Sequence, residues 1–359
     1  MNYFFKVSLT LGSLIVILTT YTLIEYPYLT VIGKYAKDPY SFLLEKRTSG
    51  SFDFLGTTHY SNYKDNLDLI TSSEIKKCPF YLTPDEPDNR NVLVSKDHIL
   101  FDNDKIKHQD QREYVKNLVP DDAELNNRLN IWFSNNINKD INKHEDFEKP
   151  IFFILFAEKI EYSDIKLIME YRAKAVKLLF IPPFIRNVFM GSDLDKIDSI
   201  KKRFISKFSS LGYEKPHLTF EIFWFNALPI YDLYMKSIRK LEENPKIVEQ
   251  ITNQSKEQEF INEIFRLYPN PRSIPYQKEG NYFSANLFLA NTDSTVFSNP
   301  LKIDLDRENY NHLTFVSPSE RSCLGADLTL NLLSYLIKKY IENKDNNMEV
   351  QNYSILQKS

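Results

Sequence analysis

Residues 315–325 read FVSPSERSCLG, and this polar loop leads into a segment with helical apolar spacing. The segment from Gly325 to Glu342 is predicted to be an amphipathic helix whose inward face carries Leu328, Leu332, Leu333, Leu336 and Tyr340. Cys323 directly precedes this helix, where the helix dipole and unpaired N–H groups stabilise a negative charge. The sequence therefore predicts a thiolate at Cys323, which is a soft and strongly donating metal ligand.

The composition excludes several classes of protein. The chain has 359 residues, of which 42% are hydrophobic and 14% aromatic, so it is long enough to bury a core of ordinary size. Its net charge of −3 provides no basic excess for binding phosphates, and we expect no nucleic-acid partner. The two cysteines, Cys78 and Cys323, do not make a disulfide framework.

Further patterned segments precede the cysteine loop. Glu263 and Arg266 are spaced i, i+3 on a predicted helix from about residue 256 to 268, so the two side chains share one face and can pair. The helix ends in RLYP at 266–269. Other distinctive segments are LEENP at 241–245, NTD at 291–293, FSNP at 297–300 and DLDR at 304–307, which ends on Arg307.

In this order, the segments resemble the motifs of the cytochrome P450 superfamily, of which this chain would be a short and divergent member. Arg321, Cys323 and Gly325 match the haem-binding signature in register, whereas Ser319 replaces its loop glycine and Val316 takes its aromatic position. The resemblance implies a mainly α fold with small β-sheets, trimmed at the N-terminal side. It also implies haem b (iron protoporphyrin IX) as the cofactor, with Cys323 as the ligand of the iron.

The resemblance assigns roles to further residues. Glu263, Arg266 and Arg307 match a structural triad that holds the cysteine loop. Arg321 would bind a haem propionate, and Gly325 would let the backbone approach the porphyrin. His108 and Arg112, spaced i, i+4, resemble a helix whose side chains also contact the propionates, although a solvated polar helix face explains the same spacing.

The distal side of the site is predicted to lie on a long helix over residues 218–241, which includes EIFWFNALPI at 221–230. Ala227 is small enough for a close approach to haem, but the hydroxyl residue that many monooxygenases of the family carry after it is missing. Asn226 instead resembles the substrate-orienting residue of enzymes that rearrange fatty-acid hydroperoxides. We assign Asn226 and Ala227 as the candidate catalytic residues.

Three functions are compatible with this pattern. The first is a monooxygenase that uses dioxygen and an NADPH-dependent reductase to oxidise a lipophilic small molecule, for example in secondary metabolism. The second is a fatty-acid hydroperoxide isomerase or lyase, which needs neither dioxygen nor a reductase. The third is a divergent haem-binding or structural protein without turnover.

The N-terminal segment Val7 to Ile24 is uncharged and about as long as the shortest bilayer-spanning helix. We expect residues 1–25 to be a single-pass membrane anchor, with the endoplasmic reticulum as the location, and residues 26–359 to be the catalytic domain. A cleaved signal peptide is the alternative, but no small-residue cleavage site follows the apolar stretch.

Overall fold

The computed structural model describes residues 34–35, 37–47, 50–54, 56–73, 75–77, 104–134, 144–156, 161–179, 190–225, 227–308 and 310–356. The chain divides into two compact units, Met1–Phe52 and Asp53–Ser359. In the first unit, helix α2 (Pro39–Lys46) begins after Asp38, whose side chain accepts a hydrogen bond from the N–H of Ser41. This N-cap and the proline at the first helical position explain why the helix starts there.

A five-stranded sheet has the order β1-β2-β5-β4-β3. Its strands are β1 (Ser51–Phe54), β2 (Thr57–Tyr60), β3 (Lys76–Lys77), β4 (Ser273–Lys278) and β5 (Asn281–Asn286). Strands β4 and β5 form an antiparallel hairpin, and β2 joins β5 in parallel, which brings the N-terminal and C-terminal parts of the sequence together. Helices α3 (Tyr63–Thr71) and α14 (Leu287–Asn291) pack against this sheet.

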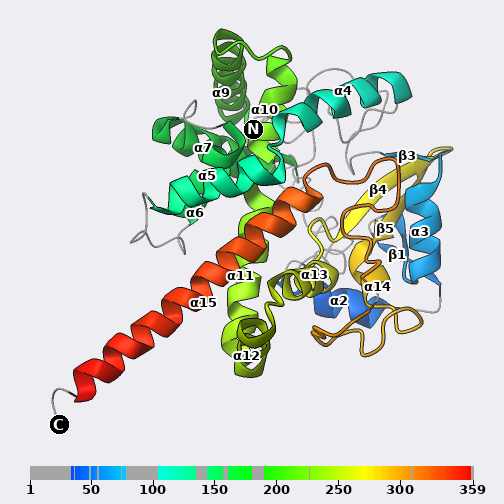
Figure 1. Ribbon diagram of the computed structural model, residues 1–359. Helices are drawn as coiled ribbons and strands as arrows, with labels where there is room; N and C mark the ends of the chain where they lie inside the picture. The colour runs from blue at the N-terminus through cyan, green and yellow to red at the C-terminus, as the bar shows by residue number, and fades with distance from the viewer. Residues whose placement is uncertain are drawn as a thin grey trace, which may run out of the picture. The chain divides into compact units, whose positions relative to one another are not determined.

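Most of the second unit is helical (Figure 1). The helices are α4 (Lys105–Leu118), α5 (Asp122–Ser134), α6 (His144–Phe156), α7 (Tyr162–Leu179), α9 (Gly191–Ser210), α10 (Pro216–Phe225), α11 (Ala227–Glu243), α12 (Pro245–Gln254), α13 (Glu257–Leu267) and α15 (Ala326–Leu356). Helix α15 packs against α11 and α13. The apolar periodicity explains this packing: Leu332, Leu333 and Leu336 of α15 are all buried in the main core.

Aromatic rings fill much of the same core. The Phe223 ring of α10 has its centroid 4.6 Å from that of Phe152 on α6 and 4.9 Å from that of Phe204 on α9. Such tilted pairs contribute about 0.5–1.5 kcal/mol beyond the area that they bury. The high aromatic content is therefore used at least partly for packing between helices.

The predicted fold class is confirmed: the chain is mainly helical with a small sheet. The expected helices over residues 256–268 and 325–342 correspond to α13 and to the first half of α15. The expected helix over residues 218–241 is described as α10 and α11, with Asn226 between them outside the described residues.

The predicted membrane localisation is corrected. Among the residues that the structure describes, no helix combines the length and the apolar character needed to cross a bilayer. The segment Val7 to Ile24, on which that prediction was based, lies outside the described residues.

Candidate functional site

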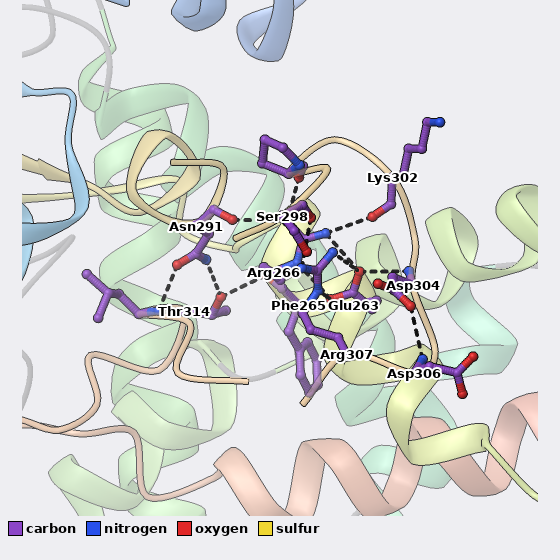
Figure 2. A network of polar contacts seen from close by, with 12 residues as sticks. Glu263, Phe265, Arg266, Asn291, Ser298, Lys302, Asp304, Asp306, Arg307 and Thr314 are labelled. Atoms are coloured by element: carbon purple, nitrogen blue, oxygen red, sulfur yellow. Dashed lines mark hydrogen bonds and ion pairs between the residues drawn. The ribbon is translucent and has the colours of Figure 1, made fainter. Parts of the chain in front are cut away.

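The best-defined polar cluster is the triad of Glu263, Arg266 and Arg307 (Figure 2). The Nε atoms of both arginines donate to Oε1 of Glu263, over 2.7 Å from Arg266 and 2.9 Å from Arg307. Glu263 and Arg266 are completely buried, and the Arg307 side chain is 4% exposed. Because a buried charge is tolerated only when it is paired and fully hydrogen-bonded, these residues depend on one another.

The two arginines also bind backbone carbonyl oxygens of the loop that follows α14. Arg266 donates to Asn291, Pro300 and Lys302, and Arg307 donates to Ser298 (Figure 2). The Phe297 ring lies 5.4 Å from the Arg266 guanidinium carbon and 5.8 Å from that of Arg307. The triad therefore fixes the course of residues 291–307 on the end of α13.

Asn291 and Thr314 connect this loop to the segment that carries the cysteine. The Asn291 side chain accepts from the N–H of Leu313 over 2.7 Å and donates to Oγ1 of Thr314 over 2.9 Å. Thr314 in turn donates to the carbonyl oxygen of Phe265 on α13 over 2.7 Å (Figure 2). A continuous set of buried hydrogen bonds thus runs from the triad helix to residue 314.

The cysteine loop continues from there as a chain of short-range hydrogen bonds. The N–H of Cys323 donates to the carbonyl oxygen of Phe315 over 2.8 Å, which closes the loop. The Ser319 hydroxyl donates to the carbonyl oxygen of Val316 and accepts from the N–H of Arg321. Val316 has a φ of 58°. The left-handed residue of this loop is thus Val316, and Ser319 holds the loop through its side chain.

The Cys323 thiol is exposed and has Arg112 beside it. The Nη1 atom of Arg112, on α4, donates over 2.8 Å to the carbonyl oxygen of Ser322. Burial lowers the pKa of Arg112 from its usual value, and Cys323 acts in the opposite direction, so the two groups interact electrostatically. A neighbouring guanidinium favours the thiolate form of a cysteine.

The other predicted residues are placed as follows. Arg321 is half-buried on the cysteine loop, and it acts electrostatically on Tyr276 of β4. His108 lies on the buried face of α4, one turn before Arg112. Gly325 accepts, through its carbonyl oxygen, from the N–H and the hydroxyl of Thr329 in the first turn of α15. The structure therefore brings Arg112, Arg321, Cys323 and Gly325 into one region.

The positions of the two candidate catalytic side chains, Asn226 and Ala227, are not described by the structure. Asn226 and the side chain of Ala227 lie outside the described residues. Near them, the buried Arg172 of α7 donates to the carbonyl oxygens of Phe223 and Trp224 at the end of α10. The Glu221 carboxylate accepts from the Trp224 indole over 2.8 Å and pairs with Lys201, so it connects α10 to α9.

Two residues of this region were not predicted from the sequence, Thr314 and Tyr276. Tyr276 is 2% exposed, and its ring belongs to the apolar cluster that also contains Leu313 and Val316 of the cysteine segment. The alternation of buried and half-buried residues along Ser273–Lys278 marks the strand but does not indicate what its side chains face.

No protein-family model and no curated protein matches this sequence. Solved structures do match it. P450BioI in complex with an acyl carrier protein has a TM-score of 0.70 at 15% identity, and the match covers 86% of this chain and 92% of that one. Epothilone B-bound P450epoK has a TM-score of 0.69 at 12% identity, with 86% and 90% covered. CYP109B1 from Bacillus subtilis has a TM-score of 0.64 at 13% identity, with 84% and 91% covered.

At these identities the similarity is one of fold, and it extends over most of both chains. It agrees with the resemblance of the ordered sequence motifs to those of the cytochromes P450. This chain therefore has the fold of the cytochromes P450.

Proposed function

We propose that this protein is a haem-thiolate monooxygenase that oxidises a lipophilic small molecule, and that Cys323 would hold the haem iron. The observation that carries the proposal is the exposed Cys323 thiol beside Arg112, on a loop that is anchored to the buried triad. Solved structures of the same fold include P450-like monooxygenases of microbial secondary metabolism.

The residues present fit the chemistry of haem b. One exposed thiolate provides a single soft ligand for the iron, and the guanidinium groups of Arg112 and Arg321 provide partners for the two propionates. His108, on the same face of α4 as Arg112, is a further candidate for a propionate.

Each of these residues contributes a separate physical effect. The hydrogen bonds of Asn291 and Thr314 hold the approach to the loop, and the Cys323 N–H bond to Phe315 closes it. The positive charge of Arg112 would favour the thiolate form of Cys323. When bound, the haem iron would activate dioxygen with electrons from an NADPH-dependent reductase.

The reaction type is tested with purified holoprotein and a panel of lipophilic substrates. Product formation that requires NADPH, a reductase and dioxygen supports the proposal. Turnover of a fatty-acid hydroperoxide without any of these would contradict it in favour of an isomerase or lyase, for which Asn226 is the substrate-orienting candidate. Asn226→Ala should then abolish that turnover, whereas it should change a reductase-dependent rate much less.

A further inference from the structure

Arg172 of α7 is a buried cation at the end of α10. The residue is 2% exposed, and its guanidinium donates to the carbonyl oxygen of Phe223 over 3.0 Å and to that of Trp224. Both oxygens belong to the last turn of α10, where the carbonyl groups of a helix lack partners within it and carry its negative partial charge. Arg172 therefore holds this helix end through hydrogen bonds and through its charge.

The guanidinium of Arg172 is itself held in place by an aromatic ring. Its carbon lies 5.3 Å from the centroid of the Phe152 ring on α6, and that ring packs 4.6 Å from the Phe223 ring of α10. A planar, stacked group that donates through two nitrogen atoms has a defined orientation, which the point charge of a lysine does not have. The directions of the two carbonyl groups that it binds are therefore fixed as well.

The side chain of Trp224 is fixed by the same neighbouring helices. The Glu221 carboxylate accepts from the Trp224 indole over 2.8 Å and pairs with Lys201 of α9. The Trp224 ring also packs edge-on against the ring of Tyr171, the residue before Arg172 on α7, with 5.5 Å between the centroids. Helices α7 and α9 together hold both the side chain and the carbonyl group of Trp224.

A proline explains why the chain needs this support. Pro229, the third residue of α11, has no N–H to donate to the carbonyl oxygen of Phe225, four residues earlier. One bond of the regular helical ladder is therefore missing across Asn226 and Ala227, the candidate catalytic residues. Stability alone is a weak reason to bury a charge at this place, because a neutral side chain of similar volume often packs as well or better. A buried charge is better suited to selecting one arrangement of the backbone.

We propose that Arg172 is a positioning residue for the distal side of the proposed active site. Because peptide groups are planar, holding the carbonyl groups of Phe223 and Trp224 sets the direction in which the backbone continues. Asn226 and Ala227 follow directly, so Arg172 acts on them through the backbone and not by contact with the substrate. This inference depends on the proposed function, since only there do these two residues face a substrate.

The test uses three variants of the holoprotein with its reductase and a substrate that the wild type oxidises. Arg172→Met removes the donors, and Arg172→Lys keeps the charge without the planar pair of donors. Lys174→Met is the matched control, because Lys174 lies on the same helix but pairs with Asp193 of α9. We expect the product formed per NADPH consumed to fall by about fivefold or more in Arg172→Met, since small displacements of positioning groups cause large losses in rate. The loss should be smaller in Arg172→Lys and absent in Lys174→Met.

A spectroscopic signature separates positioning from a general loss of stability. The C–O stretching frequency of the reduced carbon monoxide complex depends on the groups around the bound ligand, so it should shift in Arg172→Met. The Soret band of this complex should stay at the wild-type wavelength, because the loop that carries Cys323 is unchanged. Hydrogen exchange of the apoproteins measures the anchoring step alone: the amides of residues 226–228 should exchange about tenfold faster in Arg172→Met than in the wild type or in Lys174→Met.

The outcomes distinguish this inference from the proposed function. An Arg172→Met protein with the coupling and the C–O stretch of the wild type, or with unchanged exchange at residues 226–228, would overturn the inference alone. If Arg172→Met binds no haem, Arg172→Lys decides the question, and wild-type coupling in that variant would overturn the inference. A wild type that forms no product with NADPH, reductase and dioxygen would overturn the proposed function and this inference with it.

Discussion

Arg112 on α4 donates a 2.8 Å hydrogen bond to the carbonyl oxygen of Ser322, a residue 210 positions away in the sequence and adjacent to Cys323. This contact attaches the cysteine loop to a helix other than the ones that precede and follow it. The loop is thus held from three directions: by the triad through Asn291 and Thr314, by α15, and by Arg112.

Replacement of Arg112 by methionine removes both the hydrogen bond and the positive charge near Cys323. We expect the affinity of the apoprotein for haem to fall by about tenfold or more, since hydrogen bonds from charged donors contribute about 1.5–3 kcal/mol. Titration followed by the Soret band measures this affinity. Lys116→Met, on an exposed position of the same helix, should bind haem normally, and equal affinities of all three proteins would contradict the role of Arg112.

Replacement of Arg307 by methionine leaves the buried Glu263 with one of its two arginine partners. The free energy of unfolding should fall by about 3 kcal/mol, because Glu263 loses a charge-assisted hydrogen bond and the Ser298 carbonyl oxygen loses its donor. Urea denaturation measures the change, and it should be similar with and without haem. Lys202→Met removes an exposed ion pair with Asp198 and should change stability by less than about 0.5 kcal/mol. An Arg307→Met protein as stable as this control would show that the triad is not structural.

Replacement of Gly325 by alanine separates folding from cofactor binding. A Cβ at this position would lie 3.9 Å from Sγ of Cys323 and 4.0 Å from Oγ1 of Thr329, which are ordinary contacts. The apoprotein should therefore keep its thermal stability, whereas a porphyrin that packs against the backbone here would be displaced, and haem affinity should fall. A loss of apoprotein stability, or no loss of affinity, would contradict this account of Gly325.

The stability of the protein should depend on pH through His312. Burial and the nearby Arg266 lower the pKa of His312 to about 4, from 6.5 in the unfolded chain. Between these two pH values the unfolded state binds a proton at His312 and the folded state does not. The contribution of His312 to the free energy of unfolding is therefore complete above pH 6.5 and decreases as the pH falls toward 4. Between pH 6.5 and 5 the loss from this residue should be about 1.6 kcal/mol.

Urea denaturation over this pH range tests the prediction. Burial also lowers the pKa of His59 to about 4, so the free energy of unfolding of the wild type should depend on pH through both histidines. In His312→Gln, the free energy of unfolding should change less steeply with pH. His217→Gln, at an exposed position of α10, is the control substitution. An unchanged slope in His312→Gln would contradict the assignment of a neutral buried histidine.

The helical part of the fold was predictable because its signals are local. Apolar residues at helical spacing mark α13 and α15 within one or two residues at their starts. The order of the sheet was not predictable, because β2 pairs with β5, whose residues are more than 200 positions later in the chain. Helix α6 was not predicted, because its first half, from His144, is polar and carries no apolar periodicity.

The residues of the site could be predicted from the sequence where they belong to motifs that follow one another in a recognisable order. Glu263, Arg266 and Arg307 were identified in this way, and their contacts have the expected form. Thr314 and Tyr276 belong to no such motif. Thr314 has a partner that the fold brings close, the Phe265 carbonyl oxygen, and the sequence around Thr314 gives no signal of this contact.

The central claim is that the Cys323 thiolate would be the protein's ligand to a haem iron. The difference spectrum between the reduced protein with and without carbon monoxide tests it most directly, in the wild type and in Cys323→Ser. The account predicts that the wild type has the Soret band shifted to the long wavelength that is characteristic of thiolate ligation, and that Cys323→Ser loses this band. A wild type without the band, or a Cys323→Ser protein that retains it, would contradict the claim.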